Sequence, residues 1–444
     1  MKKIITGVLA VAAIALIYFY TAGSGKLNKE LKHQLDTELS TMQQNGFVIE
    51  TRSSTPKKEH FVIDFDDPKK MAAYFKRVGS KATVQDIAAL KGLKMGVDIT
   101  YQPDLYSALS MDLYPLTLPD SIRNAAEDDE DKKVLAQIEK MLAQKKVLMH
   151  IDLRKDLSAF KGYLKDIHET LRDDSGSVTL SVKGATFEGT LKKGALSTLN
   201  QKIVLLGMES SDGIKAVADK TVTTYTSTGP SPYDMDANYT VANITVAKKG
   251  QGELALNDLA INTSEKEQNG LLSSSVIATI AKSTMQAQGQ TVSMKQIVFD
   301  ARTDNLDAKA LEVLQNSDPE KNEAAFNAAL KQLLSKGVKM TVNRFAVDKI
   351  VENGNNLGDI EVKASLEVAP GIDFAQVEQN PMLLLGAIDA TTTLSLSQTI
   401  ASMIAKDPRA MMVMMLIPPK EEKGKKIYNL ILKDGKFTVN GVPL

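Results

Sequence analysis

Histidine and acidic side chains are the residues of this chain best suited to chemistry. The four histidines are His33, His60, His150 and His168, and no two of them have a helical spacing that would present both to one metal ion. His150 and Asp152 fall on the polar side of residues 147–153, where polar and apolar residues alternate. We therefore expect His150 to be solvated or hydrogen-bonded on a strand.

One acidic motif matches part of a calcium-binding loop. Asp234, Asp236 and Asn238 have the spacing of its first three ligands. The match then fails, because Tyr239 stands where the turn needs glycine and Thr245 where the loop needs a bidentate glutamate. The motif therefore predicts no calcium site. The acidic residues 127–131 and the group Asp64, Asp66 and Asp67 are interpreted as solvated surface and helix-start charge.

A second motif, residues 158–161, reads SAFK and fits the S-x-x-K pattern of acyl-transfer enzymes. That pattern has catalytic meaning only together with further motifs such as K-T-G, which the sequence lacks. The sequence also has no nucleophile elbow, no phosphate-binding loop and no dinucleotide fingerprint. It therefore predicts no catalytic residue, no cofactor and no metal ligand, and we expect the protein not to be an enzyme.

A methionine cluster near the C-terminus is a different kind of signal. Its members are Met411, Met412, Met414 and Met415. Methionine fills irregular cores and also lines adaptable apolar surfaces. The cluster therefore predicts either core packing or an apolar contact surface for a lipid or a protein partner.

Composition excludes several classes of protein. Lysine plus arginine and aspartate plus glutamate both number 54, so the formal net charge is zero and no basic surplus is available for nucleic acid. Aromatic residues make up 5% and tryptophan is absent, which disfavours stacking surfaces for bases or sugars. With no cysteine, the chain forms no disulfide and carries no lipid-modified cysteine.

The first 25 residues indicate where the protein is located. An apolar run from Ile4 to Tyr20 is interrupted only at Thr6 and Gly7 and would span roughly 25 Å as a helix at ~1.5 Å per residue. We predict a signal anchor whose membrane-embedded residues include Ile4, Leu9, Ile14, Ile17 and Tyr20. The alternatives are cleavage after Gly23 or Gly25 and a buried N-terminal helix.

Lys2 and Lys3 place the N-terminus in the cytoplasm under the positive-inside rule. The expected location is the bacterial inner membrane, crossed once, with the body of the protein in the periplasm.

The remaining chain divides at about Ser177. Residues 26–176 predict a mixed α+β region, and residues 177–444 predict a β-rich body. Helices are expected at 27–42, 68–78, 83–90, 119–146, 157–171, 324–334 and 409–416. Strands are expected at 46–51, 60–65, 97–100, 106–114, 147–153, 177–191, 221–228, 239–247, 253–263, 292–301, 338–351, 359–368, 391–396 and 427–439. The predicted class is α+β, predominantly antiparallel β in the C-terminal half, with one N-terminal transmembrane helix.

The C-terminal end carries a resemblance to a known family. Residues 428–444 read YNLILKDGKFTVNGVPL, and residues 305–311 read NLDAKAL ahead of a helix that ends in LLSKG at 333–337. This part of the chain resembles the YdgA-like bacterial envelope family, which has no assigned biochemical function. The resemblance, strongest over residues 300–444, implies a short N-terminal apolar segment and a β-rich body that ends in a closing hairpin.

Together these features predict a non-enzymatic, membrane-anchored envelope protein. A long amphipathic sheet must have its apolar face covered by helices, by a second copy or by lipid. A second copy implies a structural or self-assembling protein, which is the first expectation, with a homodimer and membrane lipid as partners. A groove that binds lipid or another hydrophobic ligand is the alternative, and an envelope enzyme of unfamiliar type is the third class.

Overall fold

The computed structural model of the chain describes residues 27–443 apart from 78–83, 127, 175, 193–194, 317–321, 373–375, 377–379, 381 and 408–417. The chain forms two compact units, Met1–Ser227 and Thr228–Leu444. The change of composition at Ser177 therefore falls inside the first unit. Within the described ranges, we find no helix that is both long and apolar enough to cross a membrane.

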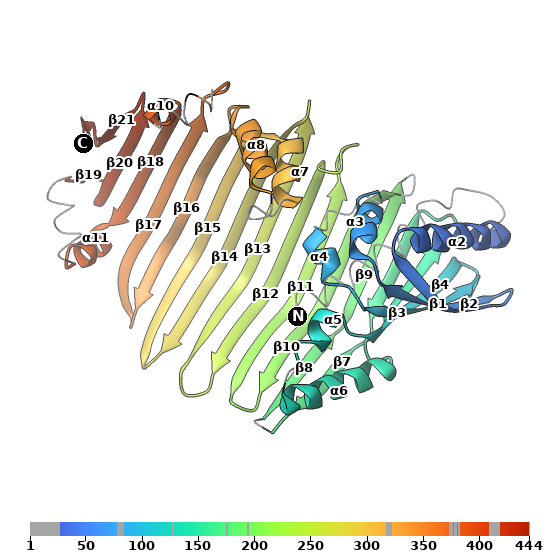
Figure 1. Cartoon of the computed structure of the whole chain (residues 1–444). Helices are drawn as coiled ribbons and strands as arrows, with labels where there is room; N and C mark the ends of the chain where they lie inside the picture. Colours follow the sequence, from blue (N-terminus) through green and yellow to red (C-terminus); the bar gives the residue numbers. More distant parts are fainter. Residues whose placement is uncertain are drawn as a thin grey trace. The chain divides into compact units, whose positions relative to one another are not determined.

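The first unit contains an antiparallel sheet in which the first six strands pair in chain order, and the sixth then pairs with the ninth rather than the seventh (Figure 1). The strands are β1 (Phe47–Ser54), β2 (Lys58–Phe65), β3 (Lys94–Tyr101), β4 (Ser107–Thr117), β5 (Met149–Arg154), β6 (Ala159–Leu164), β7 (Ile167–Arg172), β8 (Ser177–Lys183), β9 (Ala185–Lys192), β10 (Ala195–Ser210) and β11 (Ile214–Ser227). One edge of β10 pairs with both β8 and β9, which are separated by Gly184 at φ +61°. The predicted strand 177–191 is thus two strands, one after the other.

Helices cover the apolar face of the first strands and close a core. The helices of this unit are α2 (Leu27–Gln44), α3 (Pro68–Arg77), α4 (Val84–Ala88), α5 (Asp120–Arg123) and α6 (Asp129–Ala143). Side chains from α2, α3 and α4 pack on alternate residues of β1 to β5 in one buried cluster. Phe47 lies at its centre, with its ring 5.3 Å from the rings of both Phe65 and Tyr74. This unit therefore has a conventional two-layer core.

Two helix predictions in the first unit need correction. Residues 157–171 form β6 and β7, not a helix. Phe160 and Leu164 are four residues apart, a spacing that suits one helical face and one strand face alike, so pairing with β5 and β9 decides the outcome. Residues 119–146 form two helices because Asp128 caps α6, its side chain accepting a hydrogen bond from the Asp131 amide at 2.8 Å.

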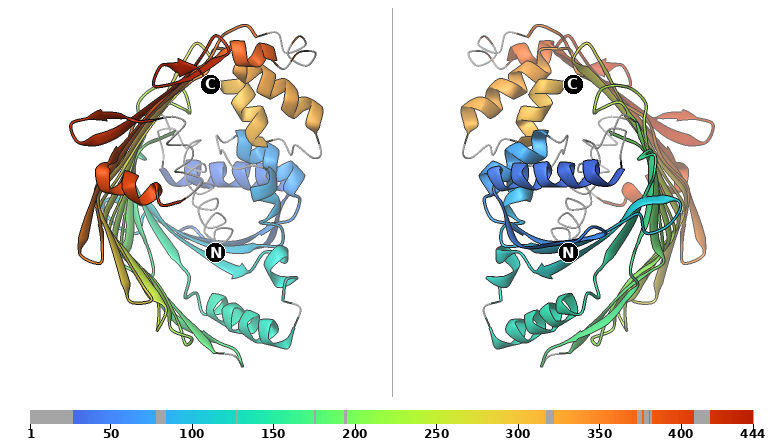
Figure 2. Two further views of the ribbon diagram at one scale, coloured as in Figure 1. Left: turned by 90° about the vertical axis from the view of Figure 1, so that its left-hand side faces the viewer. Right: turned by 90° about the vertical axis from the view of Figure 1, so that its right-hand side faces the viewer.

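The second unit is a further antiparallel meander of long strands, joined mostly by tight turns. The strands are β12 (Met235–Lys248), β13 (Gly252–Gln268), β14 (Leu271–Ala287), β15 (Gln290–Asp307), β16 (Lys339–Glu352), β17 (Asn355–Val368), β18 (Ile388–Ser397), β19 (Lys420–Glu422), β20 (Lys425–Lys433), β21 (Lys436–Val439) and β22 (Val442–Pro443). The helices are α7 (Ala308–Asn316), α8 (Glu323–Leu334), α10 (Met382–Gly386) and α11 (Gln398–Ile404). Figure 2 shows this sheet curved, with α7, α8 and α11 on its concave side.

The predicted closing hairpin is confirmed. β20 and β21 pair through Leu430 with Val439 and Leu432 with Phe437. The turn residues Asp434 and Gly435 have φ values of +50° and +70°, as a two-residue hairpin turn requires. The β-rich, antiparallel α+β class is confirmed as well, although β10 and β14 lie where the sequence predicted no strand.

Candidate functional site

The apolar face of the second unit is the candidate site. Residues directly opposite each other on paired strands lie on the same face of a sheet. One such row crosses the unit without interruption from Tyr239 on β12 to Tyr428 on β20. Between them the row contains Ile261, Ala278, Phe299, Phe345, Val362 and Leu394. Every member is apolar or aromatic.

A parallel row widens this surface, which we call the apolar face. It contains Val241, Leu259, Ile280, Ile297, Val347, Ile360 and Leu396. Beyond it the apolar positions change parity. On β13, the odd-numbered residues Leu259 and Ile261 lie on this face, and so do the even-numbered residues Leu254 and Leu256. The alternation changes between the two pairs at Asp258, whose φ is +53°. Gln296 at φ +50° marks the same change on β15. These backbone irregularities keep the apolar face continuous over the length of the strands.

Among the described residues, the apolar face is partly buried and partly exposed: Val241, Val347 and Leu396 are at most 6% exposed, whereas Tyr239 is 37% exposed. The buried cluster of the second unit is small: Leu396, Ile400 and Ala401, where α11 packs on one corner of the sheet. Phe299 and Phe345, with rings 6.5 Å apart, keep 36% and 41% of their surface exposed. A contiguous exposed apolar patch beyond a few hundred Å² usually marks an interaction site. The apolar face therefore offers a surface for an apolar partner.

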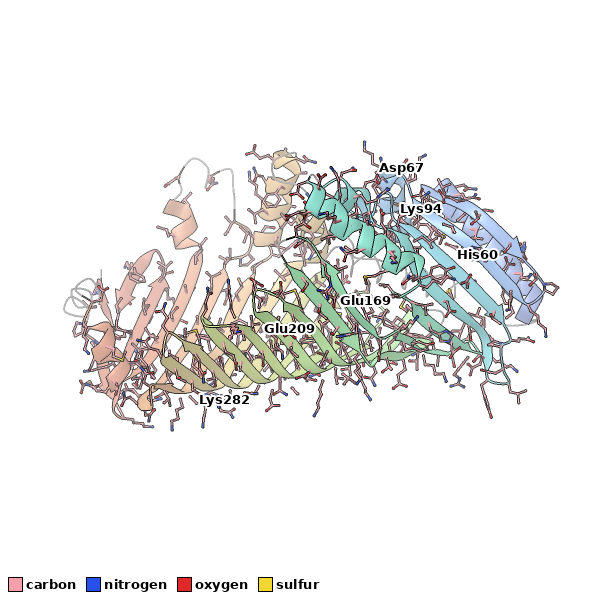
Figure 3. The ribbon with its side chains drawn as sticks, turned by 90° about the horizontal axis from the view of Figure 1, so that it is seen from below. His60, Asp67, Lys94, Glu169, Glu209 and Lys282 are labelled. Carbon is pink, nitrogen blue, oxygen red and sulfur yellow. The ribbon has the colours of Figure 1, made fainter. Side chains whose placement is uncertain are left out.

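The opposite face of the same sheet is polar. Amide side chains pair across strands there, with Asn257 Nδ2 donating to Asn243 Oδ1 at 2.9 Å and Asn343 Nδ2 donating to Asp300 Oδ1 at 3.0 Å. Lys282, labelled in Figure 3, belongs to this face, which is the convex one. The contrast between the two faces indicates that one is solvated and the other meets something apolar.

A polar row crosses the first unit. His60, Asp98, Asp112 and His150 stand directly opposite one another on β2, β3, β4 and β5. Each histidine pairs through Nδ1 with the aspartate opposite it, His60 Nδ1 with Asp98 Oδ1 and His150 Nδ1 with Asp112 Oδ1, both at 2.6 Å. His150 Nε2 also lies 3.2 Å from Asp152 Oδ1. The expectation that His150 is hydrogen-bonded on a polar strand face is confirmed.

Lys145, which follows α6, joins this row to the helix. Its Nζ lies 2.9 Å from Asp98 Oδ2 and 3.7 Å from the centre of the Tyr114 ring. Burial opposes ionisation of Asp98, but hydrogen bonds from Lys145, His60 and Tyr114 outweigh it and hold the pKa of Asp98 below its ordinary value. The row thus fastens α6 to the sheet by charge.

Removing this charge should change the acid stability of the first unit. Because the pKa of Asp98 is lower in the folded chain, its contribution is fully present above the unfolded pKa of about 3.9 and is lost as the pH falls through the folded value. We expect Asp98→Asn to destabilise the protein at pH 7 by no more than about 1 kcal/mol, because the pair is partly exposed. The difference should close below about pH 3. Thermal unfolding between pH 7 and 2.5 checks this, and a deficit that persists at pH 2.5 would contradict it.

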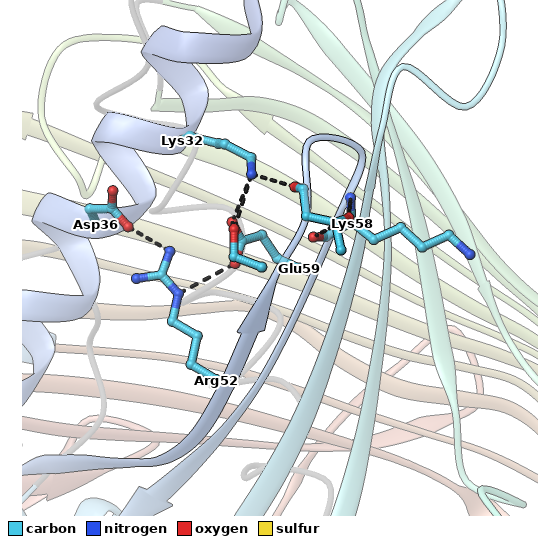
Figure 4. A network of polar contacts seen from close by, with 7 residues as sticks. Lys32, Asp36, Arg52, Lys58 and Glu59 are labelled. Carbon is cyan, nitrogen blue, oxygen red and sulfur yellow. Dashed lines mark hydrogen bonds and ion pairs between the residues drawn. The ribbon is translucent and has the colours of Figure 1, made fainter.

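A second polar network, shown in Figure 4, is structural. The Glu59 side chain is 1% exposed, and its carboxylate pairs with Lys32 Nζ and Arg52 Nε, both at 3.3 Å. Arg52 Nη2 also pairs with Asp36 Oδ1 at 2.5 Å. A buried carboxylate needs such partners to remain charged. The network fixes α2 onto β1 and β2 and leaves no free group for chemistry.

The other motifs found in the sequence have structural roles. Asp234 accepts hydrogen bonds from the amides of Ser231 at 3.1 Å and Glu267 at 2.9 Å, so its carboxylate closes a turn. Ser158 Oγ donates to Asp156 Oδ1 at 2.7 Å and the Ser158 amide donates to the same oxygen at 3.1 Å, so this side chain belongs to a local turn. Among the described residues, no group of three or more acidic or histidine side chains could hold a metal ion.

Several predicted site residues lie outside the described residues. They are the anchor residues Ile4, Leu9, Ile14, Ile17 and Tyr20 and the methionine cluster Met411, Met412, Met414 and Met415. The sequence analysis did not predict the residues of the apolar face as a site, although apolar and polar residues alternate along its strands. The sequence does not show which strands are neighbours or where the alternation changes parity.

Comparison with known proteins gives no identification. No family model matches this chain, nor does any curated protein or solved structure. Membership of the YdgA-like family therefore stays a prediction.

Proposed function

We propose that this protein binds the acyl chains of lipid on the apolar face of its second unit and is not an enzyme. The observation that carries the proposal is the unbroken row from Tyr239 to Tyr428 on the concave side of a curved sheet. At a strand spacing of about 4.8 Å, the ends of this row are roughly 34 Å apart along the sheet. Acyl chains in one leaflet of a bilayer reach about 15 Å, half of a ~30 Å hydrocarbon core, so the row can hold one end to end.

Lipid explains the chemistry of the apolar face better than a second protein copy does. A protein interface carries about one hydrogen bond per 100–200 Å² and is enriched in arginine. The two rows of the apolar face consist of aliphatic and aromatic side chains. The polar groups that they contain are the hydroxyls of Tyr239 and Tyr428. Such a surface suits a partner that makes no hydrogen bonds along its length, as an acyl chain does.

Photo-crosslinking in cells tests this function. A benzophenone amino acid at Phe345, which is 41% exposed on the apolar face, should crosslink to lipid that mass spectrometry identifies on the protein. The matched control is Ile277, which is 42% exposed but lies opposite Asp300 on the polar face. Lipid at position 345 and not at 277 supports the proposal. Crosslinking from position 345 to a second copy of this chain would replace it with self-assembly.

The membrane location is part of the proposal. Residues 4–20 anchor the chain in the inner membrane, with the N-terminus in the cytoplasm and both units in the periplasm. This places the apolar face next to a source of lipid. A reporter that is active only in the periplasm, fused after Leu444, should be active and should fractionate with membranes. An inactive reporter would contradict the orientation, and a shortened, soluble product would contradict the anchor.

A further inference from the structure

The hydroxyl of Tyr428 is an exception on the apolar face. Tyr428 is 9% exposed and stands opposite Leu394 at the β20 end of the central row. Among the described residues, its Oη has no hydrogen-bond partner although it is buried. Leaving a buried hydroxyl unpaired is unfavourable, because the hydrogen bonds that it makes in water are lost on burial. A phenylalanine would fill the same space without this penalty, so the hydroxyl calls for a partner from outside the chain.

The charges near Tyr428 narrow the chemistry of that partner. The two lysines that precede it on β20 are already paired, Lys425 with Asp359 and Lys426 with Glu421. Burial raises the pKa of the Tyr428 hydroxyl and outweighs the opposing charge of Lys426, so the hydroxyl keeps its proton and acts as a hydrogen-bond donor. A neutral donor beside neutralised lysines fits an uncharged acceptor better than it fits an anion.

We propose that Tyr428 donates a hydrogen bond to the acyl ester carbonyl of a membrane phospholipid whose chain lies along the row toward Tyr239. This inference rests on the proposed function. It adds the polar group of the ligand, an ester carbonyl, and the direction in which the acyl chain lies on the sheet. The ester is held at the β20 end of the apolar face, where α11 packs on the sheet. The row then holds the chain by apolar contact, and Tyr428 fixes its head end.

Binding of three fluorescent probes to the full chain, held in an amphipathic polymer, tests the assignment. The probes are a phosphatidylcholine with a polyene acyl chain, the free polyene fatty acid, and diphenylhexatriene, which has no carbonyl. We expect Tyr428→Phe to weaken binding of the phospholipid about five-fold, the value of one net hydrogen bond, and to leave diphenylhexatriene binding unchanged. Tyr106→Phe, which changes an 81% exposed tyrosine of the first unit, should alter neither.

The remaining outcomes separate this inference from the proposed function. Equal phospholipid affinity of Tyr428→Phe and the parent protein overturns the hydrogen bond while the apolar site stands. A loss confined to the free fatty acid overturns the ester and assigns a carboxylate instead. Weaker diphenylhexatriene binding, or a lower melting temperature of Tyr428→Phe without lipid, shows that the hydroxyl has a structural role and overturns the assignment. No binding of any probe by the parent protein overturns the proposed function itself.

Discussion

A single carboxylate on the apolar face should abolish most lipid binding. We expect Phe299→Asp to lower the affinity for a polyene phospholipid by at least about ten-fold, because an acyl chain cannot hydrate or pair the introduced charge. Phe299 lies in the middle of the central row, between Ala278 and Phe345. Since its side chain is 36% exposed in the absence of lipid, the new carboxylate can reach water and the unit should still fold.

The control for this experiment is Ile277→Asp. Ile277 is 42% exposed on the strand next to Phe299, but it lies on the polar face. The substitution has the same charge and a similar loss of apolar surface, so any general effect of charge on folding appears in both variants. Equal affinities of the two variants would mean that the apolar face does not bind the lipid. Fluorescence titration with the probe and circular dichroism of both variants give the comparison.

Local patterns in the sequence predicted part of this fold. The hairpin at Asp434 and Gly435 follows from two adjacent residues that accept positive φ, and so it needs no knowledge of the rest of the chain. In β5, Met149, Ile151 and Leu153 are buried on one face, whereas His150 and Asp152 lie on the other. This arrangement likewise follows from the alternation of side chains within one strand. Both features depend on neighbours in the sequence, which a single sequence displays.

Features that depend on strand pairing were not predictable in the same way. His60 and Asp98 are 38 residues apart, as are Asp112 and His150, and only the register of β2 to β5 brings them together. In β13 the alternation of apolar residues changes parity at Asp258, so the strand looks less amphipathic in sequence than it is in space. The segment 157–171 satisfied a helical spacing and a strand spacing at once, and non-local pairing decided between them.

The two units should respond very differently to the loss of one phenylalanine ring. Phe65 is fully buried in the first unit, against Phe47 and the helices that cover the sheet. Phe65→Ala should therefore lower the free energy of unfolding of this unit by about 3–5 kcal/mol, the usual cost of a cavity of that size. Phe345, at 41% exposure on the apolar face, already meets solvent on one side. Phe345→Ala should lower the free energy of unfolding of the second unit by less than about 1 kcal/mol, since half-exposed side chains leave no closed cavity.

Hydrogen exchange followed by mass spectrometry measures the two units separately, which a single unfolding curve of a two-unit chain does not. Peptides from β2 and β3 should lose protection in Phe65→Ala, whereas peptides from β15 and β16 should stay protected in Phe345→Ala. Adding phospholipid should raise the protection of β15 and β16 in the parent protein more than in Phe345→Ala, because the proposed function assigns this half-exposed ring to lipid binding rather than to folding. If Phe345→Ala instead unfolds the second unit without lipid, the apolar face is a packed core, and a ligand is not needed to explain its composition.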